Sequence, residues 1–481
     1  MNSLPVRVTK PGRMERDLLG EREVPASAYY GVHTLRAVEN FEISGTPISL
    51  YPDLINALAC VKKAAALANY DLGLLDEERT RAIIAACDEI RGGALHDQFV
   101  VDVIQGGAGT STNMNANEVI ANRALELMGR ARGDYSLLHP NEHVNMGQST
   151  NDVVPTALKV ASWFAVHRLI DALHGLHDAF DSKATEFKDV LKMGRTQLQD
   201  AVPMTLGQEF SAYAVMLWED MQRLRETTRL ICEINMGATA VGTGITAHPE
   251  YAERVRAHLA EITGIPLVTA PNLVEATQDA GVFVQVSGVL KRVAVKLSKV
   301  CNDLRLLSSG PRTGLGEINL PPMQAGSSIM PGKVNPVIPE VVNQIAFEVI
   351  GNDVTVSFAA EAGQLQLNAF LPIVAHSIFE SITHLRNGCL TLAERCVRGI
   401  TANHKRLDEH MSRSIGIVTA LNPYIGYANA TDIAQEALRT GRSVTDLVLE
   451  RRLLTKEKLD EILRPEALTR PVALPNSDWA A

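Results

Sequence analysis

The chain has 481 residues, of which 46% are apolar and 21% charged, a composition that excludes an intrinsically disordered protein. At about 150 residues per domain, this length predicts roughly three domains. There are 46 Lys and Arg residues against 55 Asp and Glu residues, which gives a net charge of −9. A net acidic chain without a basic cluster argues against nucleic acid as a partner.

The cysteines and the hydropathy of the chain predict its compartment. No cysteine belongs to a CxxC pair or lies near histidines at zinc-ligand spacing, so we expect buried free thiols and no metal site. Sparse cysteines are typical of a reducing compartment. The N-terminal segment lacks the apolar core of a signal peptide, and no window is long and apolar enough for a membrane span. We therefore expect a cytoplasmic protein.

The first region, residues 1–148, mixes short apolar runs with polar turns. Its pattern predicts helices over about 52–72 and 76–91. The last region, 404–481, contains shorter amphipathic segments at 432–438 and 444–450, and a capped last helix at 455–463. We expect these two regions to form an N-terminal mixed and helical domain and a small C-terminal helical domain.

The central region, 149–403, carries long seams of mostly apolar residues spaced alternately three and four apart. One seam runs from Phe210 to Ile234, with the spacing alternating as far as Ile231. A second runs from Phe283 to Leu307, and a third lies within about 155–187. This spacing is typical of long helices packed against one another. The fold class is therefore expected to be mainly α, with a central long-helix bundle, which favours sharing between subunits over one large monomeric bundle.

Four islands of small polar residues interrupt this apolar background, at 106–115, 147–152, 194–200 and 326–336. Any one of them would be explained by helix capping and loop chemistry alone. Four together, each expected at the edge of a long helix, supply hydroxyl and amide donors, helix N-termini and the cation of Lys333. Such a set is suited to hold a small anion with several carboxylate oxygens.

Two nucleotide-binding motifs are disfavoured. The Gly332-Lys333 pair is followed by Val334, where a phosphate-binding loop needs Ser or Thr for magnesium. The glycine pairs at Gly242 and Gly314 follow no convincing strand, so a dinucleotide site is not expected.

The fourth island reads GSSIMPGKVNP at 326–336 and resembles the signature loop of the aspartase/fumarase superfamily. The other islands match the remaining active-site regions of that superfamily in the same order. The resemblance covers nearly the whole chain, from DLLGEREVP at 17–25 to SIGIVTALNP at 414–423. It implies the three-domain fold of the superfamily, in which the long helices form a multi-helix core in a homotetramer and three subunits contribute to each site.

Other residues point to one branch of the superfamily. HPNEHVN at 139–145, followed by QSTND at 148–152, resembles the aspartate ammonia-lyases, with Thr150 where fumarases usually have Ser. Gln197 stands where class II fumarases carry a histidine. In those enzymes the histidine acts on water together with a loop glutamate, whose counterpart in this chain is Glu340. A neutral amide cannot act as a general acid near neutral pH, as histidine can. Ammonium needs no strong acid to leave if the amine is already protonated, so Gln197 fits a lyase better than a hydratase.

The resemblance implies anti β-elimination of ammonium from L-aspartate. Removing the Cβ proton beside a carboxylate gives a doubly charged aci-carboxylate, which preorganised donors must stabilise. Ser327 is implied as the base, and Ser328 as a substrate contact. Donors to the developing charge are implied at Thr110, Ser149, Thr150, Lys333 and Asn335. Contacts to the amino and α-carboxylate end of the substrate are implied at Asn151, Thr196 and Gln197.

The resemblance implies no required cofactor, although some aspartases are activated by magnesium, and it implies a small-molecule substrate. It leaves the roles of His139 and Glu340 open. Two alternatives also stay open at this point. One is a class II fumarate hydratase acting on malate and fumarate, and the other is a superfamily member retained as a structural protein, against which the intact signature loop argues.

Overall fold

The structure is a computed structural model that describes residues 12–471. Most of these residues are helical, and the described strands form four two-stranded sheets. The chain divides into two compact units. Unit 1 comprises Met1–Ile170, Gln222–Arg292 and Phe347–His384, and unit 2 comprises Asp171–Met221, Val293–Ala346 and Leu385–Ala481.

Unit 1 begins with an antiparallel hairpin of β1 (Gly12–Asp17) and β2 (Gly20–Pro25), followed by α1 (Val32–Asn40). The two helices predicted next are confirmed as α2 (Pro52–Asp71) and α3 (Glu77–Arg91). Proline at the first position of α2 suits the helix start, because no intrahelical bond needs its missing N–H. Asp76 caps α3 by accepting a hydrogen bond of 3.0 Å from the backbone N–H of Arg79. The buried alanine-rich side of α2 packs on α3 and α7 (Tyr251–Thr263).

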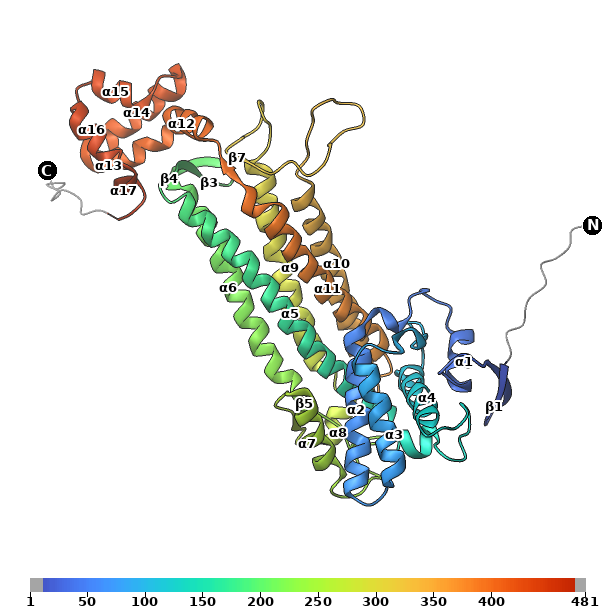
Figure 1. Ribbon diagram of the computed structural model, residues 1–481. Helices are drawn as coiled ribbons and strands as arrows, with labels where there is room; N and C mark the ends of the chain where they lie inside the picture. The colour runs from blue at the N-terminus through green and yellow to red at the C-terminus, as the bar shows by residue number, and fades with distance from the viewer. Residues whose placement is uncertain (1–11, 472–481) are drawn as a thin grey trace, which may run out of the picture. The chain divides into compact units, whose positions relative to one another are not determined.

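Five long helices contribute a segment to each unit, and Figure 1 shows them as continuous ribbons. The predicted seams at 210–231 and 283–307 lie in two of these helices. Ile234, predicted to continue the first seam, instead lies in β5 (Glu233–Ile234), which pairs in parallel with β6 (Val268–Thr269). The long helices are α5 (Thr150–Glu186), α6 (Leu206–Ile231), α9 (Gly281–Leu307), α10 (Val337–Glu361) and α11 (Leu371–Arg395).

Helix α5 has 37 residues and starts at Thr150, five residues before the start expected at 155. Pro155, near which the predicted segment begins, lies inside the second turn of the helix. A proline there cannot donate to the carbonyl of Asn151 four residues earlier. The side-chain amide of Asn235 donates to that carbonyl at 3.0 Å instead. This replacement lets the helix extend back to the polar residues at its N-terminus.

Side-chain contacts tie the helices together within each unit. In unit 1, Ser287 of α9 donates to Asp353 of α10 at 2.8 Å, and both are buried. In unit 2, the rings of Phe180, Phe210 and Tyr213 pack with centroids less than 6 Å apart and are fully or nearly fully buried. Packing of this kind holds the long helices in fixed positions within each unit.

Unit 2 also contains the hairpin of β3 (Leu191–Thr196) and β4 (Gln199–Thr205) and a small pairing of β7 (Ile318–Asn319) with β8 (Thr401–Ala402). Its C-terminal helices bury an apolar cluster of their own that includes Leu421, Ile433 and Leu447. These helices are α12 (His404–Arg413), α13 (Val418–Ile425), α14 (Tyr427–Thr440), α15 (Val444–Glu450), α16 (Lys456–Ile462) and α17 (Pro465–Leu468).

Three of these C-terminal helices correspond to predicted segments. The segment at 432–438 lies within α14, and the one at 444–450 coincides with α15. Thr455 caps α16 as expected, accepting from the N–H of Lys458 at 3.3 Å. The expectation that this helix is the last was wrong, because α17 follows it: Pro465 is well placed to open a further short helix.

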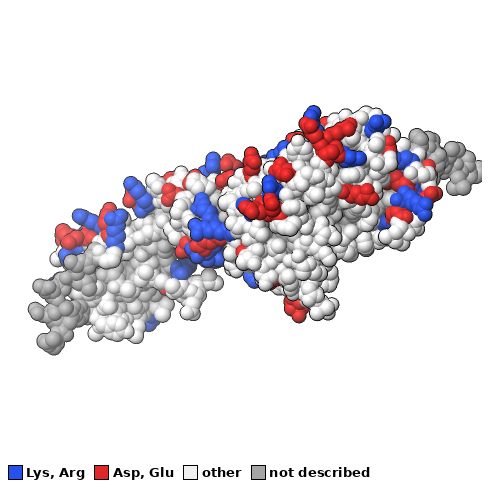
Figure 2. All heavy atoms as spheres, turned by 90° about the horizontal axis from the view of Figure 1, so that it is seen from below, with Lys and Arg blue, Asp and Glu red and all other residues white. Residues whose placement is uncertain are grey.

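Within residues 12–471, no helix is both long and apolar enough to cross a membrane. The face drawn in Figure 2 carries basic and acidic side chains interspersed with one another. All six cysteines are free and buried, as predicted. Burial raises the pKa of the Cys232, Cys389 and Cys396 thiols, which keeps them in the unreactive protonated form.

Candidate active site

The first polar island ends at the N-terminus of α4 (Thr110–Leu127) in unit 1. Gly107, Ala108 and Gly109 all have positive φ, which folds the chain into a tight loop before Thr110. A Cβ on Gly109 would lie 2.9 Å from a methyl group of Val154 on α5, so only glycine allows the two helix ends to approach this closely. Thr110, predicted as a substrate donor, is half-buried at the first position of α4, and its hydroxyl donates to the carbonyl of Gly107 at 2.8 Å.

The second island forms the N-terminus of α5, where Ser149, Thr150 and Asn151 are all half-buried. The Ser149 hydroxyl accepts from the N–H of Asn151 at 3.2 Å, as a helix cap does. The side chain of Asn151 donates to the carbonyl of Ala240 at 2.7 Å. The first N–H groups of a helix lack intrahelical acceptors and carry a partial positive charge, so this end suits an anionic ligand.

The two islands meet through Asn113, the fourth residue of α4. Its amide donates to the Thr150 hydroxyl oxygen at 3.2 Å, which leaves the Thr150 hydrogen free to donate toward a ligand. Asn113 also donates to the side chain of Asn145 at 3.2 Å. The structure therefore joins the first island to Thr150 of the second through the side chain of Asn113.

A buried cation, Lys62 of α2, also contacts Asn113. Its ammonium donates to the side-chain oxygens of Asn113, Asn145 and Gln148 at 2.7, 2.9 and 2.8 Å. These three acceptors match its three hydrogens, and the residue is fully buried. Burial lowers the pKa of Lys62 to about 7, and the negative charge of Asp152 offsets part of this lowering. Lys62 was not among the predicted site residues.

Asp152 supplies the buried negative charge that acts on Lys62. Its carboxylate accepts from the backbone N–H groups of Ser149, Gly237 and Thr239 at 2.9, 3.2 and 2.9 Å. Burial raises the pKa of Asp152 to about 6, with those N–H donors and Lys62 working in the opposite direction. An acidic group in the first turn also complements the dipole of α5. Asp152 thereby joins the loop at 237–239 to the N-terminus of α5.

The third island, in unit 2, does not lie at the edge of a long helix as expected. It forms the turn of the β3–β4 hairpin, in which Gln197 and Leu198 both have positive φ, as the two central residues of a type I′ turn require. Neither is a residue that favours this conformation, which made the hairpin hard to predict. Thr196 and Gln197, both predicted as substrate contacts, are exposed at this turn.

The hairpin is anchored by Glu317, whose side chain is fully buried. Its carboxylate pairs with Arg195 at 2.6 Å and Lys192 at 3.0 Å, and it lies 3.1 Å from His410 of α12. Burial alone would raise the pKa of Glu317, but the ion pairs with Lys192 and Arg195 outweigh it and hold the pKa below its usual range. Arg195 directly precedes Thr196, so this cluster fixes the base of the turn.

The fourth island forms the loop before α10. The N–H of Gly326 donates to the carbonyl of Lys333 at 2.7 Å, and the amide of Asn335 donates to the carbonyl of Gly326 at 2.7 Å. A Cβ on Gly326 would lie 2.7 Å from that Lys333 oxygen, so the closure requires glycine. Within the loop, the Ser327 hydroxyl oxygen accepts from the N–H groups of Ile329 and Met330 at 3.1 and 2.8 Å.

The remaining predicted groups of this loop are more open. Ser328 and Lys333 are exposed, whereas Ser327 and Asn335 are half-buried. Glu340 lies half-buried in the first turn of α10. The third and fourth islands are thus both anchored in unit 2, each by its own contacts.

His139 and His143, the two histidines of the segment at 139–145, form hydrogen bonds with neighbours in the same segment. The backbone N–H of His139 donates to the ring of His143 at 2.8 Å. The His139 ring accepts from the N–H groups of Asn141 and Glu142 at 3.1 and 3.3 Å, capping a short helical turn. Both rings therefore accept hydrogen bonds from the backbone of the segment that leads into the second island.

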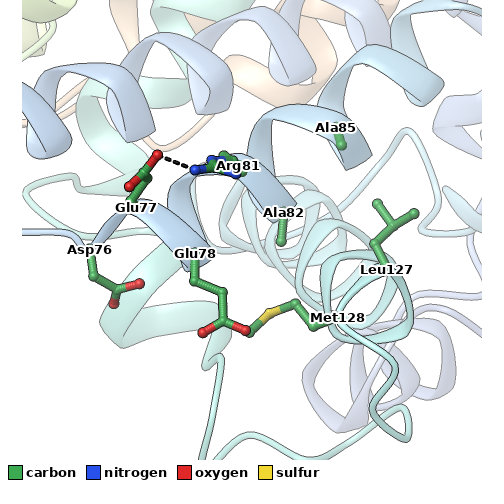
Figure 3. A pocket seen from close by; sticks show the side chains of 8 residues that line it. All are labelled: Asp76, Glu77, Glu78, Arg81, Ala82, Ala85, Leu127 and Met128. Atoms are coloured by element: carbon green, nitrogen blue, oxygen red, sulfur yellow. Dashed lines mark hydrogen bonds and ion pairs between the residues drawn. The ribbon is translucent and has the colours of Figure 1, made fainter.

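A surface cleft in unit 1 is a poor alternative site. It is lined by Asp76, Glu77, Glu78 and Arg81, and Figure 3 shows Glu77 reaching toward Arg81, to which it is hydrogen-bonded. Three carboxylates against one paired guanidinium repel an anionic ligand. None of the predicted site residues lines it.

Comparison with known sequences decides the family. The chain is 60% identical over 464 residues to the aspartate ammonia-lyase of Pseudomonas aeruginosa, covering 96% of this chain and 98% of that one. It is 58% identical over 461 residues to the aspartate ammonia-lyase of Helicobacter pylori, with the same coverage of both. The enzyme of the same name from Escherichia coli K12 is 56% identical, over 95% of this chain and 96% of that one. The chain belongs to the aspartate ammonia-lyase family.

Family profiles and solved structures agree with this placement. The profile described as "Lyase" matches residues 20–351, and "Fumarase C C-terminus" matches 417–470. A crystal structure of fumarate lyase:delta crystallin from Brucella melitensis bound to cobalt is 56% identical, with a TM-score of 0.94, covering 96% of this chain and all of that one. A class II fumarase from Schistosoma mansoni is 35% identical with a TM-score of 0.90, covering 94% and 98%. Aspartate ammonia-lyases and class II fumarases thus share this mainly helical superfamily fold.

Sequence reasoning missed the buried charges that support the predicted residues of this family site. Glu317 lies in an unremarkable stretch, and nothing local marks it as buried. Lys62 left one signal, since it interrupts an otherwise apolar face of the alanine-rich helix α2. A lysine in such a position is rarely buried without partners.

Proposed function

We propose that the chain converts L-aspartate to fumarate and ammonium by anti β-elimination, with Ser327 taking the proton from Cβ. Membership of the aspartate ammonia-lyase family makes it a carbon–nitrogen lyase, and the identity of 56–60% to three aspartate ammonia-lyases carries the assignment of substrate. In the reaction, the electron pair of the broken C–H bond is held in the aci-carboxylate and then forms the Cα–Cβ double bond. The Cα–N bond breaks with its electron pair staying on nitrogen, and the ammonia so released takes up the proton removed from Cβ to give ammonium.

The surroundings of Ser327 support its role as the base. A serine hydroxyl has a high pKa, so its alkoxide needs stabilisation before it can remove a proton. The N–H groups of Ile329 and Met330 both point at the Ser327 oxygen, and hydrogen bonds to a charged form favour that form. Two fixed donors are the kind of preorganised stabilisation that an alkoxide requires.

The donors of the first two islands would bind the carboxylates. Thr150 has its oxygen occupied by Asn113, so its hydrogen is available, and Ser149 and Asn151 stand at the partly positive N-terminus of α5. Thr110 lies at the matching end of α4. Lys333, Asn335 and Ser328 from the loop, and Thr196 and Gln197 from the hairpin, would complete the set of substrate contacts.

We infer a homo-oligomer, and expect the homotetramer typical of the superfamily. Phe347, Val354 and Phe358 of α10 are 63%, 50% and 70% exposed. Their spacing of seven and four residues puts them on one face of that helix. Large apolar side chains in such a row are unusual on a free surface and common at helix–helix interfaces. Burial of this row between subunits would account for it.

We also infer a cytoplasmic location, in line with the buried free cysteines, which suit a reducing compartment. The reaction as proposed uses side chains and backbone donors alone and needs no organic cofactor. Activation by magnesium is a separate question that a titration of the activity with magnesium chloride would answer.

The activity is tested by following the ultraviolet absorbance of fumarate with the purified protein. We expect fumarate to form from L-aspartate, and to form poorly or not at all from L-malate. Fumarate formation from L-malate but not from L-aspartate would replace the assignment with a class II fumarate hydratase. Activity on neither substrate would contradict both.

A further inference from the structure

Three metal-ligating side chains converge in unit 1, outside all four polar islands. They are Glu348 of α10 and Glu380 and His384 of α11. One ligand atom from each lies within 4.8 Å of the others. Among the described residues, this is the one group of three or more histidine, cysteine or acidic side chains whose ligand atoms meet in this way.

The two helices hold these groups in a chelating arrangement. Glu380 and His384 are four residues apart, so their side chains lie on the same face of α11 one turn apart. Glu348 approaches from α10, with its carboxylate 2.7 Å from Nδ1 of His384. Nearby, the amide of Asn352 donates to the hydroxyl of Ser381 at 3.2 Å and fixes the two helices against each other. The three ligands therefore project from two rigid elements.

Charge and burial favour a cation between them. The side chains of Glu348, Glu380 and His384 are 37%, 29% and 40% exposed, so each is partly withdrawn from water but can be reached. An ion pair between Glu348 and His384 explains one contact but leaves the second carboxylate, Glu380, in the same small space. Two carboxylates and a neutral imidazole together carry two negative charges, which one divalent cation neutralises.

A further histidine supports the Glu380 carboxylate from one turn away. Nε2 of His376 lies 3.8 Å from Glu380, and its Nδ1 is 2.6 Å from the hydroxyl of the buried Tyr51. Ligands held from behind in this way keep their orientation, which raises the affinity of a metal site.

We propose that Glu348, Glu380 and His384 bind one divalent cation of the zinc class per chain. Zinc takes carboxylate oxygen and imidazole nitrogen ligands, and three protein ligands with an open fourth position are a common zinc arrangement. The imidazole distinguishes this set from the all-oxygen sites that magnesium and calcium prefer. The bound ion would join α10 to α11, so it would stabilise the folded protein by mass action.

The test measures zinc binding to the full-length protein after treatment with EDTA and removal of the chelator. Calorimetric titration with zinc chloride is expected to show one binding site per chain. A thermal scan is expected to show a higher melting temperature with zinc chloride than without it. His384→Ala is expected to weaken zinc binding by more than about tenfold, since loss of even a supporting partner costs roughly 10–100-fold. Glu380→Gln removes a ligand charge while keeping the shape, and should weaken binding similarly.

His174→Ala is the matched control. His174 also lies four residues from a carboxylate on its own helix, Asp178 of α5, but among the described residues that pair belongs to no group of three ligands whose atoms all lie within 4.8 Å of one another. Zinc affinity should not change in this variant. The proposal is overturned if wild type shows no saturable zinc site, or if the His384 and Glu380 variants bind zinc as wild type does. Magnesium chloride binding as tightly as zinc chloride, independently of His384, would overturn it as well.

Discussion

The ammonium of Lys62 lies 2.7 Å from the side-chain oxygen of Asn113, and the amide of the same Asn113 donates to the hydroxyl of Thr150. Asn113 is thus oriented from behind by a buried cation, which fixes which end of its amide faces Thr150. A flipped amide would present its oxygen to Thr150 and draw the hydroxyl hydrogen inward, away from a ligand. Lys62 therefore determines in which direction Thr150 donates.

Replacing Lys62 with Met tests this relationship. Three buried side-chain oxygens lose their donor, so we expect the free energy of unfolding to fall by about 3 kcal/mol. We also expect KM for L-aspartate to rise, because Thr150 no longer has a fixed orientation. Chemical denaturation and steady-state kinetics measure the two effects.

Lys63→Met is the matched control one residue away. Lys63 pairs with Asp88, whose side chain is 44% exposed, and exposed pairs contribute little to stability. Its free energy of unfolding should change by less than about 1 kcal/mol. Equal effects of the two substitutions would contradict the role given to Lys62.

The buried carboxyl of Asp152 predicts a pH dependence of stability. Its pKa is about 6 in the folded chain against 3.8 ordinarily, because burial disfavours the charged form. A raised pKa contributes stability that is fully present below pH 3.8 and is lost as the pH rises through about 6. The stability of wild type relative to Asp152→Asn should therefore fall between pH 4 and 6 and level off above that range. Denaturation midpoints at several pH values measure it, and a flat difference would contradict the assignment.

Glu317 is expected to act as a positioning residue for the hairpin turn. Glu317→Gln removes the carboxylate charge that pairs with Arg195 and Lys192, so we expect the free energy of unfolding to fall by about 3–5 kcal/mol. The displaced turn should raise KM more than it lowers kcat, because Thr196 and Gln197 are expected to bind substrate. The lowered pKa of Glu317 means that this stabilisation is present above its ordinary pKa and disappears as the pH falls through the lowered value.

Glu409→Gln is a suitable comparison for Glu317→Gln. Glu409 pairs with Arg406 of the same helix near the surface, where its side chain is 37% exposed. We expect its stability and KM to stay close to wild type. The account of the hairpin would be wrong if Glu317→Gln left KM unchanged while lowering stability.

The sequence predicted the long helices and the polar islands because both depend on local patterns. The seam from Phe283 to Leu307 follows helical periodicity, and α9 covers it from Gly281 to Leu307. The island at 147–152 is rich in residues that cap helices, and α5 begins within it. Short-range chemistry of this kind can be interpreted without knowing the tertiary structure.

The buried charges and the hairpin depend instead on distant partners. Glu317 is paired with Arg195, 122 residues away, and no local pattern marks Glu317 as the partner of that island. The turn at Gln197 and Leu198 lacks the Gly or Asn that would have predicted it, and it is held by the cluster around Glu317. Domain borders near 148 and 403 stay a prediction, as do the roles of the individual site residues.

The most direct measurement of the central claim is the rate of fumarate formation from L-aspartate by Ser327→Ala beside wild type. A general base contributes roughly 10²–10⁴-fold, so we expect kcat to fall by at least about 100-fold, with unchanged circular dichroism. Ser412→Ala, which changes an exposed serine hydrogen-bonded to a backbone carbonyl, should keep wild-type turnover. A correctly folded Ser327→Ala protein that retained wild-type turnover would contradict the account.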